Sequence, residues 1–196
     1  MRIALLEDQQ EQAQHIQSIL SERGHHCDSF PTGQSFLSAA LHRSYDLMIL
    51  DWQIPDMTGI DVLKSVRAQI NWPIPVVFLT QRDSESDIVE ALDAGADDFL
   101  AKPARAAELV ARINALARRA NPDNEKEVLI YGPFKINTQH RTIALHGEAL
   151  TLTDKDFDLT LFLFQNQGRL LTREVLLERV WGLTRDINDL PARLSS

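Results

Sequence analysis

The chain has 196 residues, of which 44% are hydrophobic and 24% are charged, and this composition is typical of globular proteins with one large domain or two small ones. It carries 20 Lys and Arg against 28 Asp and Glu, a net charge of −8, and neither half has the basic excess typical of a nucleic-acid-binding domain. No apolar run approaches the roughly 18 residues of a membrane span, and the single cysteine, Cys27, excludes an internal disulfide and favours a reducing, cytoplasmic location.

Residues 1–120 alternate short apolar runs with longer amphipathic stretches. The apolar runs predict strands over residues 2–6, 25–30, 46–50, 75–79 and 97–101. The amphipathic stretches predict helices over residues 9–24, 33–43, 58–69, 84–95 and 106–120. Strands that alternate with helices predict βαβ units and a doubly wound, five-stranded parallel sheet. The runs "LMIL" and "VVFL" are apolar throughout, as is typical of strands buried on both faces.

The pattern changes after residue 120. "ANPDNEKE" is polar and contains proline and two asparagines, which predicts a linker. Short runs with turn signals at Gly132-Pro133, Asn137-Thr138 and His146-Gly147 follow, and they predict a small antiparallel sheet. Two helices are predicted next, over residues 153–168 and 172–182, the first with Thr153 and Asp156 as a capping box.

Polar side chains follow four of the five predicted parallel strands. Glu7 and Asp8 follow the first, Asp51 the third, Thr80 the fourth and Lys102 the fifth. Because ligands of open α/β sheets bind outside the carboxyl ends of the strands, we expect these groups to converge. Each residue alone has an ordinary alternative: Asp8 with Glu11 can be a capping box, Asp51 a loop carboxylate, Thr80 a helix-cap partner and Lys102 a solvated lysine. Their conjunction favours a functional site.

This set of groups predicts phosphoryl transfer at a metal site. Three clustered carboxylates repel one another and raise one another's pKa, and a hard divalent cation such as Mg²⁺ relieves that repulsion. Asp51 can then act as a nucleophile that takes a phosphoryl group. Mg²⁺ and Lys102 neutralise charge on the transferred group, and the Thr80 hydroxyl donates a hydrogen bond to it.

The segments "LLED", "LMILDWQIPDMTGIDVLKSVR", "VVFLT" and "ALDAGADDFLAKP" resemble the receiver domain of bacterial two-component response regulators, over about residues 1–119. The resemblance implies a flavodoxin-like fold in which Asp51 accepts phosphate from a sensor histidine kinase. It also implies Mg²⁺ ligands and a phosphoryl contact, namely Glu7, Asp8, Asp51 and the backbone carbonyl of Gln53 for the metal and Lys102 for the phosphoryl group. The Lys102–Pro103 bond is expected to be cis. Gln53 and Arg82 flank the site and are expected to tune the lifetime of the phosphoryl group.

The same resemblance implies a switch. Thr80 and Phe99 match the family's switch pair, in which the hydroxyl moves toward the phosphate and the ring turns inward. Phosphorylation adds about −1.5 to −2 charges, which is enough to bias a bistable face. A plain core aromatic remains the alternative for Phe99.

The segment "LTDKDFDLTLFLFQNQGRLLTREVLLERVWG" resembles the winged-helix effector domain of the OmpR/PhoB type. We therefore expect a receiver over 1–119, a linker over 120–126 and an effector domain over 127–196. In that subfamily two receivers form a homodimer through a charged face, which here corresponds to Asp97, Asp98, Glu108, Arg112, Arg118 and Arg119. A solvated charged face is the alternative.

Members of that subfamily continue after "WG" with a recognition helix and a wing. Here "LTRDINDLPARLSS" offers Arg185 and Arg193, and Pro191 is not tolerated in the middle of a helix. We therefore expect most of the recognition helix and the wing to be missing, and binding to promoter DNA to be impaired.

The sequence thus predicts a response regulator that controls transcription through phosphorylation and dimerisation, rather than an enzyme. The alternative is a phosphorylation-dependent interaction module, or a dimerising competitor, that does not bind DNA. A phosphatase with an aspartyl phosphate would need an acid two residues after the nucleophile, where Gln53 stands.

Overall fold

The computed structural model describes residues 1–70, 72–82, 84–120 and 126–182. The described residues divide into two compact units, the first formed by the part before residue 121 together with Gly168–Leu170, and the second by residues 126–167 and 171–182. Each unit has its own sheet and its own buried core. Within the described residues, none of the helices has the length and apolar character needed to cross a membrane.

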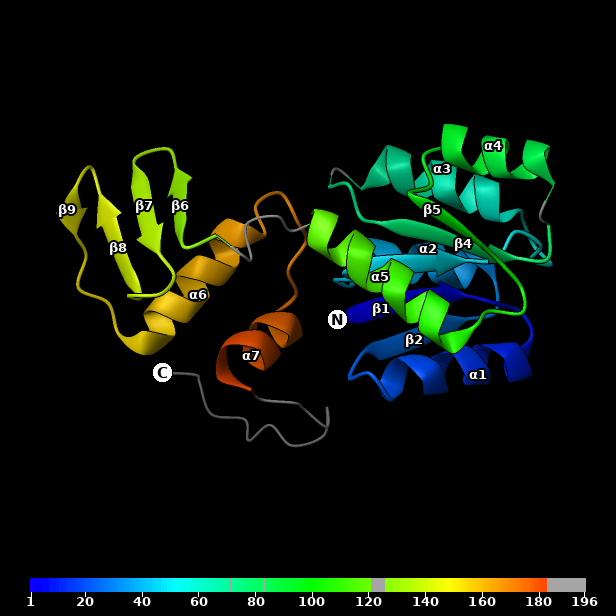
Figure 1. The fold of residues 1–196 in the computed structure, drawn as a ribbon, viewed down its shortest axis with the longest axis horizontal. Coiled ribbons are helices and arrows are strands. Elements are labelled where there is room, and N and C mark those ends of the chain that lie inside the picture. The colour runs from blue at the N-terminus through cyan, green and yellow to red at the C-terminus, as the bar shows by residue number, and fades with distance from the viewer. Residues whose placement is uncertain (71, 83, 121–125, 183–196) are drawn as a thin grey trace, which may run out of the picture. The chain divides into compact units, whose positions relative to one another are not determined.

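The first unit is built on a five-stranded parallel sheet with the strand order β2-β1-β3-β4-β5 (Figure 1). Its strands are β1 (Arg2–Leu6), β2 (His26–Phe30), β3 (Leu47–Leu50), β4 (Val76–Thr80) and β5 (Asp98–Ala101). Every neighbouring pair is parallel, and Leu6 pairs with both Phe30 and Leu50. The central strands β3 and β4 are buried along their whole length, as their uniformly apolar sequences predict.

Helices cover both faces of this sheet. They are α1 (Gln10–Ser21), α2 (Gly33–His42), α3 (Gly59–Gln69), α4 (Glu85–Asp93) and α5 (Ala106–Ala120). One buried cluster joins α1 and α5 to one face of the sheet, and another joins α2, α3 and α4 to the opposite face. The predicted doubly wound fold with this flavodoxin-like strand order is confirmed.

Most of the predicted helix starts are also found. Thr58 and Asp61 form a complete capping box at the start of α3, and the Ser84 hydroxyl accepts a hydrogen bond from the Asp87 amide at the start of α4. The alternative in which Asp8 and Glu11 cap the first helix is wrong, because α1 begins at Gln10 with Gln9 at the N-cap position.

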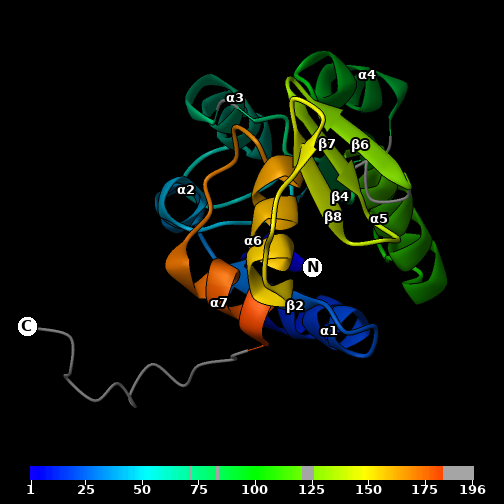
Figure 2. The same ribbon diagram turned by 90° about the vertical axis from the view of Figure 1, so that its left-hand side faces the viewer.

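The second unit is a smaller α+β assembly, as predicted. Its antiparallel sheet has the order β6-β7-β8-β9, with β6 (Val128–Tyr131), β7 (Phe134–Asn137), β8 (Thr142–Leu145) and β9 (Glu148–Ala149). Two helices follow, α6 (Asp154–Gln165) and α7 (Arg173–Trp181), which pack against each other (Figure 2). His146 and Gly147 both have positive φ, 51° and 90°, as a tight turn between β8 and β9 requires.

Among the described residues, one buried cluster of the second unit consists of Leu129, Ile136, Ile143 and Phe157, and Val175 and Val180 of α7 are also buried. Thr153 and Asp156 form the predicted capping box at the start of α6. The expectations about a missing recognition helix and wing fall on residues 183–196, which lie outside the described residues, as does most of the expected linker.

Candidate functional site

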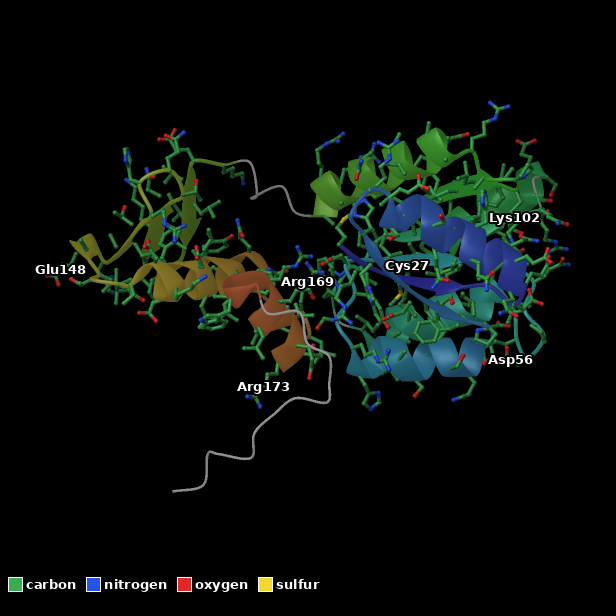
Figure 3. The ribbon with its side chains drawn as sticks, turned by 90° about the horizontal axis from the view of Figure 1, so that it is seen from below. Cys27, Asp56, Lys102, Glu148, Arg169 and Arg173 are labelled. Carbon is green, nitrogen blue, oxygen red and sulfur yellow. The ribbon has the colours of Figure 1, made fainter. Side chains whose placement is uncertain are left out.

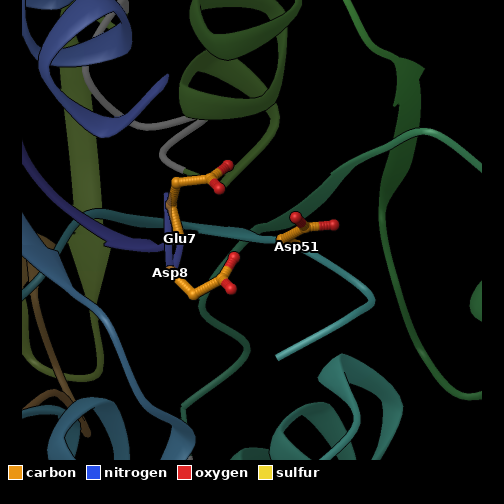
Figure 4. Close-up of side chains that lie close together, drawn as sticks. All are labelled: Glu7, Asp8 and Asp51. Carbon is orange, nitrogen blue, oxygen red and sulfur yellow. The ribbon is translucent and has the colours of Figure 1, made fainter. Parts of the chain in front are cut away.

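Three carboxylates converge at the carboxyl edge of the parallel sheet (Figure 4). Glu7 and Asp8 follow β1 and Asp51 follows β3, and each offers an oxygen within 4.8 Å of the others. The convergence follows from the topology, because β1 and β3 are adjacent and parallel and therefore end at the same edge. Glu7 and Asp51 are buried, 2% and 7% exposed, whereas Asp8 is exposed.

Lys102 closes the site from the end of β5. Its Nζ donates to Glu7 Oε2 at 2.5 Å and to Asp51 Oδ2 at 2.6 Å. Its side chain is only 7% exposed, so all three charged groups are largely removed from water. Burial raises the pKa of Glu7, and the hydrogen bond and charge of Lys102 act in the opposite direction. The Lys102–Pro103 peptide bond is cis.

The backbone around Asp51 is held tightly. The Asp51 amide donates to the Leu6 carbonyl at 2.9 Å, and the Trp52 amide donates to Asp51 Oδ1 at 2.6 Å. The Gly59 amide donates to the Trp52 carbonyl at 2.8 Å. A Cβ added to Gly59 would lie 2.1 Å from the Asp51 carbonyl oxygen, so only glycine permits this approach. Gln53 is exposed and forms an isolated bridge with Thr58.

Thr80 and Phe99 lie on the neighbouring strands β4 and β5. Thr80 is 1% exposed, and its Oγ1 accepts a hydrogen bond from the Arg82 amide at 3.3 Å. The Lys102 amide donates to the Thr80 carbonyl at 2.8 Å, which fixes the end of β5 to that of β4. Phe99 is half-buried, pairs in register with Phe78, and packs against the cluster beneath α3 and α4.

Most charges of the expected dimer face are engaged within this chain. Arg112 donates to Asp98 at 2.9 Å and to Glu108 at 3.0 Å. Asp97 accepts from Arg67 at 3.0 Å and from the Val76 amide at 2.8 Å. Arg118 and Arg119 are exposed in the last turn of α5, where positive charge favours the helix dipole.

Two sets of contacts at the site were not predicted from the sequence. The Arg82 guanidinium lies 5.3 Å from the centre of the Trp52 ring and 3.5 Å from Asp87, so it links the Asp51 loop to α4. The Asp56 carboxylate binds the first amides of α2. Neither contact follows a helical or strand spacing, which is why periodicity could not reveal it.

The donor set suits a hard cation. Three carboxylates from two adjacent loops offer oxygen ligands, the preferred ligands of Mg²⁺, and one lysine cannot neutralise all three negative charges. A nucleophilic carboxylate, a buried ammonium and a hydroxyl thus lie at the end of a sheet that can also hold a divalent metal. This fold and site define a receiver-type signalling domain.

Comparison with known proteins agrees. Residues 3–114 match the response regulator receiver domain, and residues 147–190 match the C-terminal domain of transcriptional regulatory proteins. The sensory transduction protein RegX3 of Mycobacterium tuberculosis is 37% identical over 183 residues, which span 92% of this chain and 80% of the relative. The DNA-binding response regulator MtrA of Mycolicibacterium smegmatis is 36% identical over 181 residues, spanning 92% and 78%.

Solved structures show the same likeness. The response regulator DrrB of Thermotoga maritima, an OmpR/PhoB homologue, aligns with a TM-score of 0.53 and 29% identity over 92% of this chain and 79% of its own. A Francisella receiver domain aligns with a TM-score of 0.58 and 33% identity over 60% and 97%. The chain belongs to the OmpR/PhoB family of two-component response regulators, with a receiver domain and a winged-helix DNA-binding domain. These are transcription regulators rather than conventional enzymes, and membership implies a histidine kinase partner and DNA binding.

Proposed function

We propose that Asp51 accepts a phosphoryl group from a sensor histidine kinase, at a site where Glu7, Asp8, Asp51 and the Gln53 carbonyl hold Mg²⁺. The observation that carries the proposal is the convergence of the three carboxylates with Lys102 at one edge of the sheet. A merely structural role does not account for it, because three acidic groups gathered around one cation cost free energy through their mutual repulsion.

In the reaction, a carboxylate oxygen of Asp51 attacks phosphorus as the bond from phosphorus to the kinase's histidine nitrogen breaks. The electron pair of that bond leaves with the imidazole, and an acyl phosphate forms. Bound Mg²⁺ would neutralise the carboxylates and the transferred group. The Lys102 ammonium, now 2.6 Å from Asp51 Oδ2, can follow the developing charge onto a phosphoryl oxygen, and the Thr80 hydroxyl can donate to another.

The phosphoryl group then acts as a switch. Thr80 and Phe99 would transmit the change at Asp51 to the face formed by α4, β5 and α5. The charged residues of this face are Asp97, Asp98, Glu108, Arg112, Arg118 and Arg119. Homodimerisation through this face would require Arg112 to exchange its partners Asp98 and Glu108 for groups on the second copy. Such an exchange is sensitive to small displacements of β5 and α5, so it suits a phosphorylation switch.

For the output, we propose transcriptional control with weak DNA binding by this chain. The described segment that follows the expected linker, residues 126–182, has equal numbers of basic and acidic residues. Several of its cations are engaged internally: Arg141 pairs with Asp154 and Asp158, and Lys155 donates to the Val180 carbonyl. This charge balance also favours the second candidate, an interaction module or dimerising competitor without DNA binding. Steep loss of promoter binding with added salt by the phosphorylated chain would exclude that candidate.

Phosphorylation is tested with acetyl phosphate and Mg²⁺. We expect wild-type protein to gain acid-labile phosphate, and EDTA or Asp51→Asn to abolish the gain. Asp93→Asn, at an exposed position in α4, is the matched control and should label normally. Undiminished labelling of Asp51→Asn would overturn the assignment.

The switch is tested separately. Thr80→Ala should still be phosphorylated, because the nucleophile and the metal ligands remain, but should dimerise less in analytical ultracentrifugation after phosphorylation. Dimerisation equal to that of the wild type would remove Thr80 from the switch.

A further inference from the structure

The loop that carries the phosphoacceptor, residues 51–59, is tied at its tip to a helix that contributes nothing else to the site. Asp56 accepts hydrogen bonds from the Gly33 amide and the Gln34 amide, both at 2.9 Å. These are the first two amides of α2, and they lie more than 20 residues before Asp56 in the sequence. Figure 3 labels Asp56 and Lys102 at the same end of the first unit.

Met57 reinforces the same attachment. A Cβ at Gly33 would lie 2.5 Å from both Cγ and Sδ of Met57, so the absence of a side chain at Gly33 lets the loop approach the helix. Met57 itself is half-buried and packs against the core beneath α2 and α3. Two consecutive residues of the loop therefore contact the start of α2, one through charge and one through packing.

The base of the loop is held by other contacts. Gly59 donates to the Trp52 carbonyl at 2.8 Å, and Gln53 forms a bridge with Thr58. Between these anchors, Ile54 and Met57 pack against the core, and Asp56 ties the exposed tip to α2. Gln53, whose carbonyl is the proposed fourth metal ligand, stands between the tip and Asp51 in the sequence, so a displaced tip can displace this carbonyl.

We infer that Asp56 is a positioning residue that docks the phosphoacceptor loop on the N-terminus of α2 and thereby sets the affinity of the site for Mg²⁺. This inference rests on the proposed function. The two bonds have the form of charge-assisted hydrogen bonds to free amides, and the positive end of the α2 dipole favours the carboxylate. Hydrogen bonds from the Gln34 and Gly33 amides lower the pKa of Asp56, so the contact is present at neutral pH.

The same helix end offers a matched control. The Thr32 side chain caps α2 by accepting from the Ser35 amide at 3.2 Å, without contacting the loop. Thr32→Ala therefore weakens the start of α2 and leaves the loop attached, whereas Asp56→Ala detaches the loop and leaves the Thr32 cap in place. Asp56→Asn keeps one acceptor and serves as a milder variant if Asp56→Ala does not fold.

In the experiment, Mg²⁺ alone is titrated into the full chain, and its dissociation constant is measured by calorimetry and by tryptophan fluorescence. Fluorescence is suitable because Trp52 adjoins Asp51. We expect Asp56→Ala to raise the dissociation constant about tenfold, at the lower end of the effect of partners that orient metal ligands. Asp56→Asn should have a smaller effect in the same direction, and Thr32→Ala should stay within about twofold. Labelling by acetyl phosphate at saturating Mg²⁺ should be close to wild type in all three variants.

Each outcome is decisive. Unchanged Mg²⁺ affinity in folded Asp56→Ala, or an equal loss in Thr32→Ala, would overturn the inference and leave Asp56 as a helix cap. If wild-type protein binds Mg²⁺ and Asp51→Asn still labels, the proposed function fails instead, so the two failures are distinguishable.

Discussion

The two units of this chain begin helices with the same capping motif, but the first buries a group of charged side chains and the second keeps its ion pairs at the surface. Thr58 with Asp61 in the first unit and Thr153 with Asp156 in the second form equivalent capping boxes. The first unit also keeps Glu7, Asp51 and Lys102 almost fully buried. In the second unit, the ion pairs of Arg141 with Asp154 and Asp158 lie at the surface. Local rules of helix formation are thus shared, and the difference comes from tertiary burial.

The size of the core explains this difference. The sheet of the first unit is covered on both faces, so a site at its edge can be shielded from water. The core of the second unit is smaller: among the described residues it holds the cluster of Leu129, Ile136, Ile143 and Phe157, with Val175 and Val180 also buried. Buried charges cost several kcal/mol of desolvation unless they are paired, and only the larger core provides both the shielding and the partners.

The largest loss of stability is expected when the buried charge cluster loses its lysine. Lys102→Ala leaves Glu7 and Asp51 without their shared cation, so the first unit should lose about 3 kcal/mol of unfolding free energy in the absence of metal. Mg²⁺ should restore more stability to this variant than to the wild type, because it can replace the missing positive charge. Urea unfolding with and without Mg²⁺ checks this, with the exposed Lys64→Ala as control. A loss below about 1 kcal/mol would show that the cluster is effectively solvated.

A similar loss in the second unit should have a different consequence. Ile136 is fully buried in the small core, and Ile136→Ala should cost about 3 kcal/mol through lost burial and a cavity. We expect the second unit to unfold while acetyl phosphate still labels the first. Circular dichroism and labelling of the same sample measure both, and loss of labelling would contradict the independence of the units.

A smaller effect is expected at Arg82. Its side chain is 44% exposed, and its contacts are a ring face at 5.3 Å and an ion pair at 3.5 Å. Arg82→Ala should therefore destabilise the first unit by about 1 kcal/mol or less, and the lifetime of the phosphoryl group should change. Urea unfolding and the decay of acid-labile phosphate provide the measurements. If the lifetime equals that of the wild type, the contacts of Arg82 with Trp52 and Asp87 have no effect on the phosphoryl group.

The smallest expected effect is on the stability of the first unit at acid pH. The Thr58 side chain and amide lower the pKa of Asp61 below its ordinary 3.8, so the unfolded state binds the proton more readily than the folded state. The resulting stability is present above pH 3.8 and is lost as the pH falls through the lowered folded-state pKa. Asp61→Asn should flatten the fall of the urea midpoint between about pH 5 and 2. A curve parallel to that of the wild type would assign the acid sensitivity to other groups.

Much of the fold could be predicted from the sequence because the central strands of the first unit, β1, β3 and β4, are distinct apolar runs. The site was partly readable as well, since parallel strands end at one edge and Glu7, Asp8 and Asp51 follow such ends. The capping alternative for Asp8 failed because its carboxylate joins the acidic cluster and Gln9 takes the N-cap position. The contact of Asp56 with α2 could not be predicted, because it depends on how a loop tip meets a helix 22 residues away.

The central claim is that Asp51 carries the phosphoryl group, and borohydride reduction tests it most directly. Protein labelled with acetyl phosphate and Mg²⁺ is reduced, which converts an aspartyl phosphate to homoserine, and its peptides are analysed by mass spectrometry. We predict homoserine at position 51, and none when EDTA is present during labelling. Conversion at Asp8 or reduction of Glu7 with position 51 unchanged, or conversion of Asp51 without Mg²⁺, would contradict the account.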